Sequence, residues 1–227
     1  MERNPEFVHA AFSSIAPRYA AANHFLSLGI DILWRRRVVR MVSPWKPRRI
    51  LDVATGTGDL ALALSRALPG AEITGTDFCR PMLDRAARRG LKNLVLADAL
   101  HLPMAADSYD VLTVAFGLRN MADYTCALNE FRRVIRPGGR LLVLDFSMPR
   151  GWWGKLYRLY LHHVLPRAAG WMTGNPGAYT YLGDSIEAFP RGEAMLALLA
   201  GCGYREPRCT PLSRGVASIY TAVKPAP

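Results

Sequence analysis

The sequence predicts an α/β fold in which helices flank a doubly wound, mostly parallel β-sheet. Three observations predict this fold. Short apolar runs alternate with helical patterns through the middle of the chain, a glycine-rich turn joins the first strand to a helix, and an acidic residue stands at the end of each of three successive strands. Strands that alternate with helices form parallel sheets with right-handed crossovers. Ligands of such sheets bind at the carboxyl ends of the strands, where we expect the functional site.

The glycine-rich turn follows a predicted strand at residues 49–54 and precedes a predicted helix at 59–68. Gly56 and Gly58 can adopt backbone conformations that are closed to other residues, and they let a ligand approach the main chain closely. The run from Gly56 to Ala61 also fits the G-x-G-x-x-A pattern of dinucleotide-binding proteins. Because that pattern is too common to identify a cofactor, the turn indicates only a nucleotide-like ligand.

Three acidic residues narrow the choice of ligand. Asp52 precedes the glycine turn, where its charge would repel a pyrophosphate and attract an ammonium group. Asp77 follows a predicted strand at 71–76 and can accept hydrogen bonds from both hydroxyls of a ribose. Asp98 follows a strand at 93–97 and can accept from an adenine amino group. Each acid alone is more simply explained as a turn or helix-cap residue. Acids after three successive strands together favour S-adenosylmethionine, which carries a sulfonium and an ammonium and no phosphate.

The remaining elements complete the sheet. We expect helices at 80–90, 122–136 and 192–201, and strands at 109–115, 139–146, 204–210 and 216–223. The run Arg136-Pro137-Gly138-Gly139-Arg140 predicts a sharp turn from helix to strand. A nicotinamide enzyme would need a second mononucleotide-binding half, which is missing. The organisation is that of a class I S-adenosylmethionine-dependent methyltransferase with an antiparallel C-terminal strand. It divides into an N-terminal helical lid at 1–47, a cofactor-binding core at 48–150, a helical substrate-side insertion at 151–190 and a C-terminal part at 191–227.

Composition indicates a globular protein of 227 residues, half of them apolar. No apolar run is long enough for a membrane-spanning helix, and the first residues lack the pattern of a secretion signal. The four cysteines have neither C-x-x-C nor metal-ligand spacing, so we expect free thiols, no metal and a cytoplasmic location. The oligomeric state stays open between a monomer and a homodimer.

The net charge of +11, carried mostly by arginine, suggests either nucleic acid or an anionic membrane surface as a partner. Enzymes that methylate amino groups of nucleic acids carry Asn/Asp-Pro-Pro-Tyr after the fourth strand, and this chain has Phe116-Gly117-Leu118-Arg119. Cytosine-carbon methyltransferases need a cysteine in a Pro-Cys context, which is also missing. We therefore expect no nucleic acid partner. A binding module with a vestigial site is the other alternative, against which the intact acids and glycines argue.

Several motifs in order resemble the UbiE/MenG quinone-biosynthesis C-methyltransferases over almost the whole length. They are Phe12-Ser13-Ser14-Ile15-Ala16-Pro17-Arg18-Tyr19, Phe116-Gly117-Leu118-Arg119-Asn120, the run from Arg133 to Ser147, His163-Val164-Leu165-Pro166, and the run from Tyr179 to Ile186. The chain differs from the family pattern at Ala20, Asp31, Ala115 and Asp145, where Asp, His, a small polar residue and Glu are usual.

The resemblance implies transfer of a methyl group from S-adenosylmethionine to a ring carbon of a prenylated quinol. Demethylmenaquinol is the expected acceptor, with the ubiquinone-pathway 2-methoxy-6-polyprenyl-1,4-benzoquinol and other small lipids or natural products as alternatives. It implies that Thr57, Asp77 and the pair Asp98-Ala99 contact the cofactor. We also expect Phe78 and Ala115, which stand at the ends of two strands, to line the same site.

For catalysis, the ring carbon becomes nucleophilic when the neighbouring hydroxyl loses its proton, so the protein must align the reactants and help to remove that proton. Arg119 can stabilise the phenolate directly or through a water that Asn120 orients. Tyr19 is a candidate contact from the lid, and His163 is more simply a packed helix residue. The aromatic region 152–171 can cover the prenyl tail, with arginines meeting lipid headgroups. We therefore expect peripheral contact with the inner face of a membrane.

Overall fold

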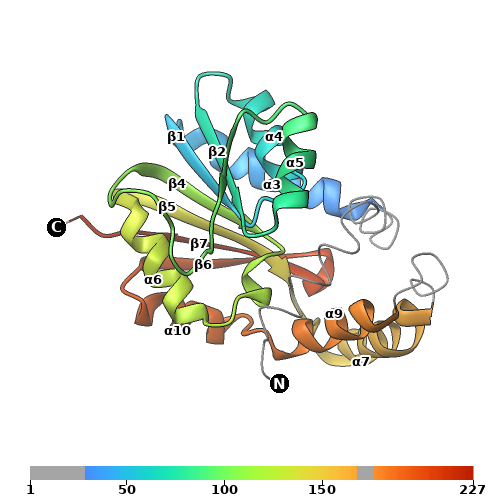
Figure 1. Cartoon of the computed structure of the whole chain (residues 1–227). Helices are drawn as coiled ribbons and strands as arrows, with labels where there is room; N and C mark the ends of the chain where they lie inside the picture. Colours follow the sequence, from blue (N-terminus) through green and yellow to red (C-terminus); the bar gives the residue numbers. More distant parts are fainter. Residues whose placement is uncertain (1–28, 168–175, 227) are drawn as a thin grey trace.

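The computed structural model describes residues 29–167 and 176–226, which form a seven-stranded sheet between helices (Figure 1). The strands lie in the order β3-β2-β1-β4-β5-β7-β6. Strands β1 to β5 are parallel, and β7 pairs antiparallel with both β5 and β6. The bounds are β1 Arg49–Val53, β2 Glu72–Asp77, β3 Asn93–Leu96, β4 Tyr109–Ala115, β5 Ile135–Phe146, β6 Arg205–Leu212 and β7 Ala217–Val223. The predicted α/β fold with its antiparallel end is confirmed.

Helices cover both faces of the sheet (Figure 1). On one face lie α3 (Ile30–Val42), α4 (Asp59–Ala67) and α5 (Arg80–Arg88), and on the other lie α6 (Tyr124–Val134) and α10 (Glu193–Gly201). Successive residues of a strand point to opposite faces, so each strand feeds two cores. In β1, Ile50 packs with α3 and α4, whereas Leu51 and Val53 pack with α6 and α10.

The strand order reverses between β1 and β4, and this position determines where a ligand can bind. Neighbouring parallel strands whose connections leave in opposite directions open a crevice at their carboxyl ends. The glycine turn after β1 and the short helix η2 (Leu118–Asn120) after β4 border this crevice.

The segment after β5 forms a helical unit at the end of the sheet (Figure 1). It comprises α7 (Gly151–Leu159), the π-helical segment η3 (Tyr160–Val164) and α9 (Pro176–Ala188). Leu161 and Leu165 are buried with Met148 and Ile186, whereas Leu156 is half-exposed. A π-turn inserts one residue and rotates the following side chains around the helix axis. The apolar side chains of this segment are therefore divided into a buried part and an exposed part.

Most boundaries lie within one or two residues of the prediction, and the largest difference is at the junction of α6 and β5. Helix α6 ends at Val134, and β5 begins directly at Ile135, which pairs with Tyr109. The predicted turn lies inside β5 as a register shift with Gly138 at φ 75°. An irregular strand of this kind gives no alternating pattern that sequence could reveal. Of the N-terminal helical lid predicted at 1–47, only the part from Gly29 lies within the described residues, and its helix α3 begins at Ile30.

Three short helical turns, η1 (Ser43–Trp45), η2 and η4 (Ser213–Gly215), complete the described chain. Trp34 on α3 donates a hydrogen bond from its indole nitrogen to the Ser213 hydroxyl at 2.9 Å, so the first described helix is fixed to the turn between β6 and β7. Within the described ranges, no helix combines the length and apolar character needed to cross a bilayer. The division into four parts stays a prediction.

Candidate cofactor site

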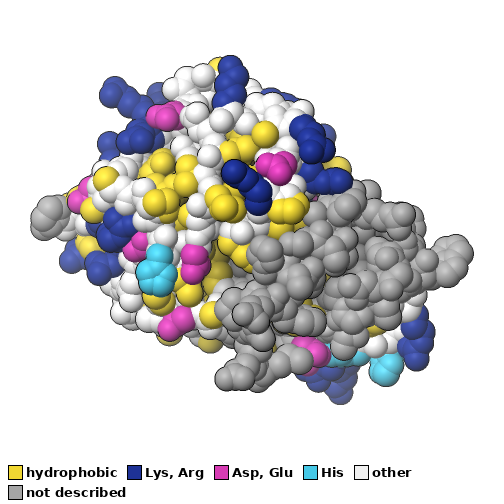
Figure 2. All heavy atoms as spheres, viewed as in Figure 1, with side chains coloured by type: hydrophobic (Ala, Val, Ile, Leu, Met, Phe, Trp, Pro, Cys, Tyr) yellow, Lys and Arg dark blue, Asp and Glu magenta, His cyan; other side chains and the backbone are white. Residues whose placement is uncertain are grey.

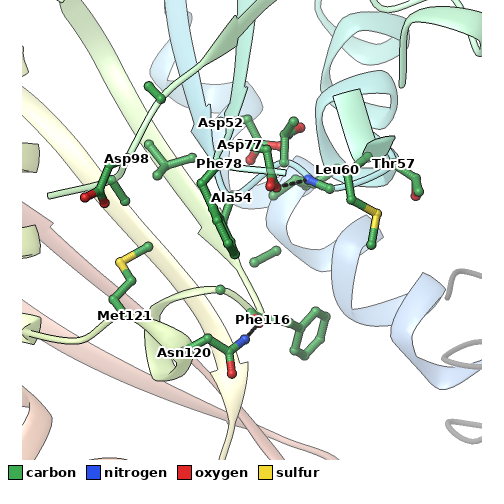
Figure 3. Close-up of a pocket in the computed structure, with 18 of the residues that line it drawn as sticks. Asp52, Ala54, Thr57, Leu60, Asp77, Phe78, Asp98, Phe116, Asn120 and Met121 are labelled. Atoms are coloured by element: carbon green, nitrogen blue, oxygen red, sulfur yellow. Dashed lines mark hydrogen bonds between the residues drawn. The ribbon is translucent and has the colours of Figure 1, made fainter. Parts of the chain in front are cut away.

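A cavity of about 300 Å³ lies at the carboxyl ends of β1, β2, β3 and β4 (Figure 3). Among the residues that line it are Asp52, Gly56, Thr57, Asp77, Phe78, Asp98, Ala99, Ala115 and Asn120, all predicted from sequence as site residues. Asp52 and Asp77 lie side by side, with Asp98 and Met121 across the hollow and Asn120 and Phe116 below (Figure 3). The strand ends therefore bring together acids that are far apart in the sequence.

Asp77 fixes the glycine turn. Its Oδ2 accepts a hydrogen bond from the Gly56 amide at 2.8 Å, and its Oδ1 accepts from the Cys79 amide at 2.9 Å. Both carboxylate oxygens are thus held in place while they line the cavity. A carboxylate oxygen has two acceptor sites, so each can accept more than one donor.

Asp52 is almost completely buried, and two threonines hold it. Thr55 donates to Oδ2 at 2.7 Å, and Thr113 donates to Oδ1 at 2.6 Å. Burial raises the pKa of Asp52 to about 6, although both hydroxyls and the positive charge of Arg35 oppose this effect. A cation bound beside Asp52 would stabilise its ionised form.

The adenine end of the predicted site is more open. Asp98 accepts a hydrogen bond from the Leu100 amide at 3.0 Å, and its side chain is 60% exposed. Phe78 is 37% exposed and also lines the cavity. An exposed carboxylate can accept a hydrogen bond from a ligand that binds at this edge of the cavity.

The turns after β1 and β4 meet at one point of the cavity wall. Ala54 and Phe116 both have positive φ, at 51° and 60°, which is uncommon for residues other than glycine. A Cβ atom on Gly117 would lie 2.5 Å from the Ala54 Cβ, so only glycine fits there. The wall is therefore formed by two turns in close contact.

Arg119 lies behind this wall. It is buried, and it is not among the described residues that line the cavity. Its Nη1 donates to Oδ1 of Asp145 at 2.7 Å and to the Phe116 carbonyl at 2.6 Å. Its guanidinium also stacks on Phe146, 5.1 Å from the ring centroid. Asn120, in contrast, lines the cavity and donates a long bond of 3.4 Å to the Phe116 carbonyl.

Gly58 is the other predicted site residue that is not among the described lining residues. It caps α4 with φ at 81°, and a Cβ atom there would lie 3.2 Å from that of Ala86 on α5. Its position reflects close helix packing. Tyr19 lies outside the described residues. His163 is exposed on η3.

Sequence reasoning missed Thr113, Gly117 and Arg35. Thr113 bonds Asp52 from the neighbouring strand, and only the strand pairing reveals this contact. Arg35 lines the cavity from α3, although in the sequence it looks like one member of a charged run.

The sequence pattern of the ubiE/COQ5 methyltransferase family matches residues 1–224. The chain belongs to this family. A relative named demethylmenaquinone methyltransferase from Thermus thermophilus is 50% identical, and the alignment covers 94% of this chain and 100% of the relative. A protein of the same name from Deinococcus radiodurans is 46% identical over 96% of this chain and 92% of its own length. The ubiquinone/menaquinone biosynthesis C-methyltransferase UbiE from Syntrophotalea carbinolica is 43% identical over 95% of this chain and 93% of its own length.

Solved structures support the fold of this family member. A S-adenosylmethionine-dependent methyltransferase from Thermotoga maritima superposes with a TM-score of 0.69 at 19% identity, covering 95% of this chain and 99% of its own. Human N-acetylserotonin methyltransferase in complex with S-adenosylmethionine gives a TM-score of 0.64 at 17% identity, and the superposition covers 95% of this chain and 59% of the human chain. Identities this low show the fold alone.

The protein is a class I methyltransferase whose cofactor is S-adenosylmethionine. The donor set of the cavity fits this group. Four carboxylates, of Asp52, Asp59, Asp77 and Asp98, line the cavity, and Arg35 is the only lysine or arginine among its described lining residues. A predominantly acidic cavity favours a cationic ligand over a polyphosphate.

Proposed function

We propose that this protein transfers the methyl group of S-adenosylmethionine to a ring carbon of a prenylated quinol, with demethylmenaquinol as the acceptor and menaquinol as the product. The acid-lined cavity supports the cationic donor. The acceptor rests on the names of relatives that are 50% and 46% identical over nearly the whole chain. The 2-methoxy-6-polyprenyl-1,4-benzoquinol of the ubiquinone pathway is the second candidate, favoured by the name of the 43% identical relative.

In this proposal the acids at the strand ends hold the donor. Asp52 faces the ammonium group, Asp77 the ribose hydroxyls, and Asp98 with Ala99 the adenine amino group. Gly56 and Thr57 approach the donor through the glycine turn, while Phe78 and Ala115 cover it with apolar surface. The donor supplies an electrophilic methyl on its sulfonium. The protein thus contributes mainly alignment, which can be worth roughly 7–11 kcal/mol.

Asn120 and Arg119 stand on the acceptor side. Asn120 lines the cavity and can orient a water or the quinol hydroxyl. Arg119 reaches this end through its bond to the Phe116 carbonyl, and its fixed positive charge favours the developing phenolate. The hydroxyl proton leaves to solvent or to a base, the methyl–sulfur bond breaks as the carbon–carbon bond forms, and the ring carbon then loses its own proton.

The prenyl tail needs an apolar surface, which a groove of about 440 Å³ along α7 offers. Trp153, Leu156 and Tyr157 are among the residues that line it. Burial raises the pKa of Tyr157, and the charge of Arg119 opposes this rise. In this proposal the ring lies near Asn120 and the tail extends towards α7.

Exposed apolar side chains on α7 and η3 support peripheral membrane contact. Trp152 is 66% exposed, Leu159 54% and Val164 51%. Lys155 and Arg158 are exposed on the same helix. Amphipathic surfaces of this kind bind anionic bilayers through both apolar burial and charge. Elsewhere the lysines and arginines are spread over the visible face rather than gathered in one patch (Figure 2).

A direct assay tests the acceptor. Purified protein is incubated with S-adenosylmethionine and either demethylmenaquinol or the benzoquinol, and the products are separated by mass spectrometry. Faster formation of menaquinol supports the proposal, and faster methylation of the benzoquinol supports the second candidate. Methylation of neither, with cofactor binding intact, would exclude both. Deletion of the gene should also leave a quinone one methyl group lighter in cell extracts.

A further inference from the structure

The cofactor has one anionic group, the carboxylate of its methionine moiety, and none of the roles above gives it a partner. Four carboxylates line the cavity and cannot bind it. Arg35 is the only lysine or arginine among the described lining residues. A guanidinium beside a sulfonium and an ammonium would repel both, so Arg35 can strengthen cofactor binding only if it faces the anionic group.

The position of Arg35 matches the place where this carboxylate must lie. The amino and carboxylate groups of methionine share one carbon atom, so the partner of the carboxylate must stand close to that of the ammonium. Asp52 is the proposed ammonium partner, and the charge of Arg35 opposes the rise that burial causes in the pKa of Asp52. Both residues line the same cavity.

Arg35 is held in place before any ligand binds. Its Nη1 forms an ion pair with Asp31 one helical turn earlier, and its guanidinium lies 5.4 Å from the centroid of the Phe116 ring. Its side chain is only 13% exposed. The hydrogen bond of the neighbouring Trp34 to Ser213 fixes the helix itself. A pre-organised side chain loses little entropy on binding.

Donors of Arg35 remain for a ligand. The Nη2 atom lies 3.8 Å from Oδ2 of Asp59, which is too long for a hydrogen bond. A guanidinium carries five donors arranged as a fork, a geometry that suits a carboxylate. Asp31 uses one side of this fork, and Nη2 faces the first turn of α4, which borders the cavity through Asp59 and Leu60.

We propose that Arg35 binds the α-carboxylate of the methionine moiety of S-adenosylmethionine, and that Asp31 holds Arg35 in the orientation this requires. The inference rests on the cofactor and is independent of which quinol is methylated. It assigns a function to one arginine of the run Arg35-Arg36-Arg37 and none to the other two, which are exposed on the same helix.

The test measures ligand affinity by calorimetry, without turnover. Four ligands are compared: S-adenosylmethionine, S-adenosylhomocysteine, decarboxylated S-adenosylmethionine and 5′-methylthioadenosine. The first two carry the carboxylate, and the last two lack it. We expect Arg35→Gln to lower the affinity for the two ligands with the carboxylate by about tenfold or more, as loss of one charge-assisted pair predicts. The affinity for the two ligands without the carboxylate should stay unchanged or rise.

Matched variants keep the test decisive. Arg36→Gln and Arg37→Gln remove the same charge from the same helix and should leave all four affinities unchanged. Because Arg35→Gln removes one partner of the buried Asp31, the double variant Asp31→Asn/Arg35→Gln is measured beside it and should show the same selective loss of affinity.

Three results would overturn the proposal. One is an equal loss of affinity for all four ligands in both Arg35 variants, which indicates a structural role. The second is no loss for any ligand. The third is unchanged cofactor affinity with a raised KM for the quinol, which places Arg35 at the acceptor. Failure of the unmodified protein to bind S-adenosylmethionine would instead contradict the assignment of S-adenosylmethionine as the cofactor.

Discussion

Arg119 and Asp145 form an ion pair inside the protein, with 2.7 Å between Nη1 and Oδ1 and neither side chain more than 4% exposed. The pair joins β5 to the turn after β4, since Asp145 also accepts from the Arg119 amide and Arg119 donates to the Phe116 carbonyl. Phe116 adopts a positive φ and borders the cavity. The pair therefore fixes a strained part of the cavity wall.

Arg119→Ala should destabilise the protein by about 3–5 kcal/mol, because it leaves the carboxylate of Asp145 buried without this cation. The measurement is the free energy of unfolding in urea, together with turnover of the quinol. Loss of turnover in this variant alone would not separate folding from catalysis.

The double variant Arg119→Met/Asp145→Leu separates the two effects. Replacement of both partners removes the uncompensated charge, so most of the stability should return. Turnover should stay low, since no cation then stands behind Asn120. Recovered turnover in the double variant would remove Arg119 from the mechanism.

The affinity for S-adenosylmethionine should depend on pH through Asp52. With a pKa of about 6 in the free protein, this acid is largely protonated at pH 5 and ionised at pH 7.5. The ammonium group favours the ionised form, so affinity should be about tenfold lower at pH 5, and binding near pH 6 should release a proton. Calorimetry in buffers of different ionisation enthalpy measures both quantities.

The Asp52→Asn variant should bind S-adenosylmethionine more weakly than the unmodified protein at all pH values, and its affinity should no longer depend on pH in this way. Asp84→Asn, at an exposed position on α5, is the matched control and should keep the profile of the unmodified protein. An unchanged pH profile in Asp52→Asn would show that another group titrates.

Gly117→Ala should impair cofactor binding, because its Cβ would lie 2.5 Å from that of Ala54 and push the two turns apart. Gly70→Ala is the control, since nothing lies within 4 Å of a Cβ atom there. We expect a loss of cofactor affinity of about tenfold or more for the first variant, as for other overpacked sites that cost 1–3 kcal/mol, and no change for the second. Equal affinities for both variants would contradict the close contact.

Trp152→Ser/Leu159→Ser should weaken binding to anionic vesicles at low salt while cofactor affinity stays unchanged. Both side chains are more than half exposed on α7, so the loss reflects membrane contact rather than folding. Leu96→Ser, at a 49% exposed residue of β3, is the control for lost surface hydrophobicity. Failure of the unmodified protein to sediment with anionic vesicles would exclude peripheral attachment through α7.

The fold and most of the cavity could be predicted because their signals are local. Gly56 follows an apolar strand, and Asp77 and Asp98 each stand at a strand end, so sheet topology alone brings them together. Asp52 could be predicted as a site residue from its position before the glycine turn alone. In each case the chemistry of the residue and its position along one strand sufficed.

Contacts between distant segments could not be predicted in this way. The burial of Arg119 depends on Asp145 at the end of another strand, and the contact of Gly117 with Ala54 depends on two turns that meet only in the fold. For Gly58 the sequence does not separate two reasons for glycine, which are close packing against α5 and close approach of a cofactor. Arg35 was hidden in a charged run whose other members face solvent.

The bond from the Trp34 indole to Ser213 connects an early helix to a turn near the end of the chain. During synthesis, α3 therefore lacks this anchor until Ser213 has left the ribosome. Helix α3, which carries Arg35, should reach its final position only when β6 and β7 close the sheet. We therefore expect an incomplete nascent chain to bind the methyl donor weakly.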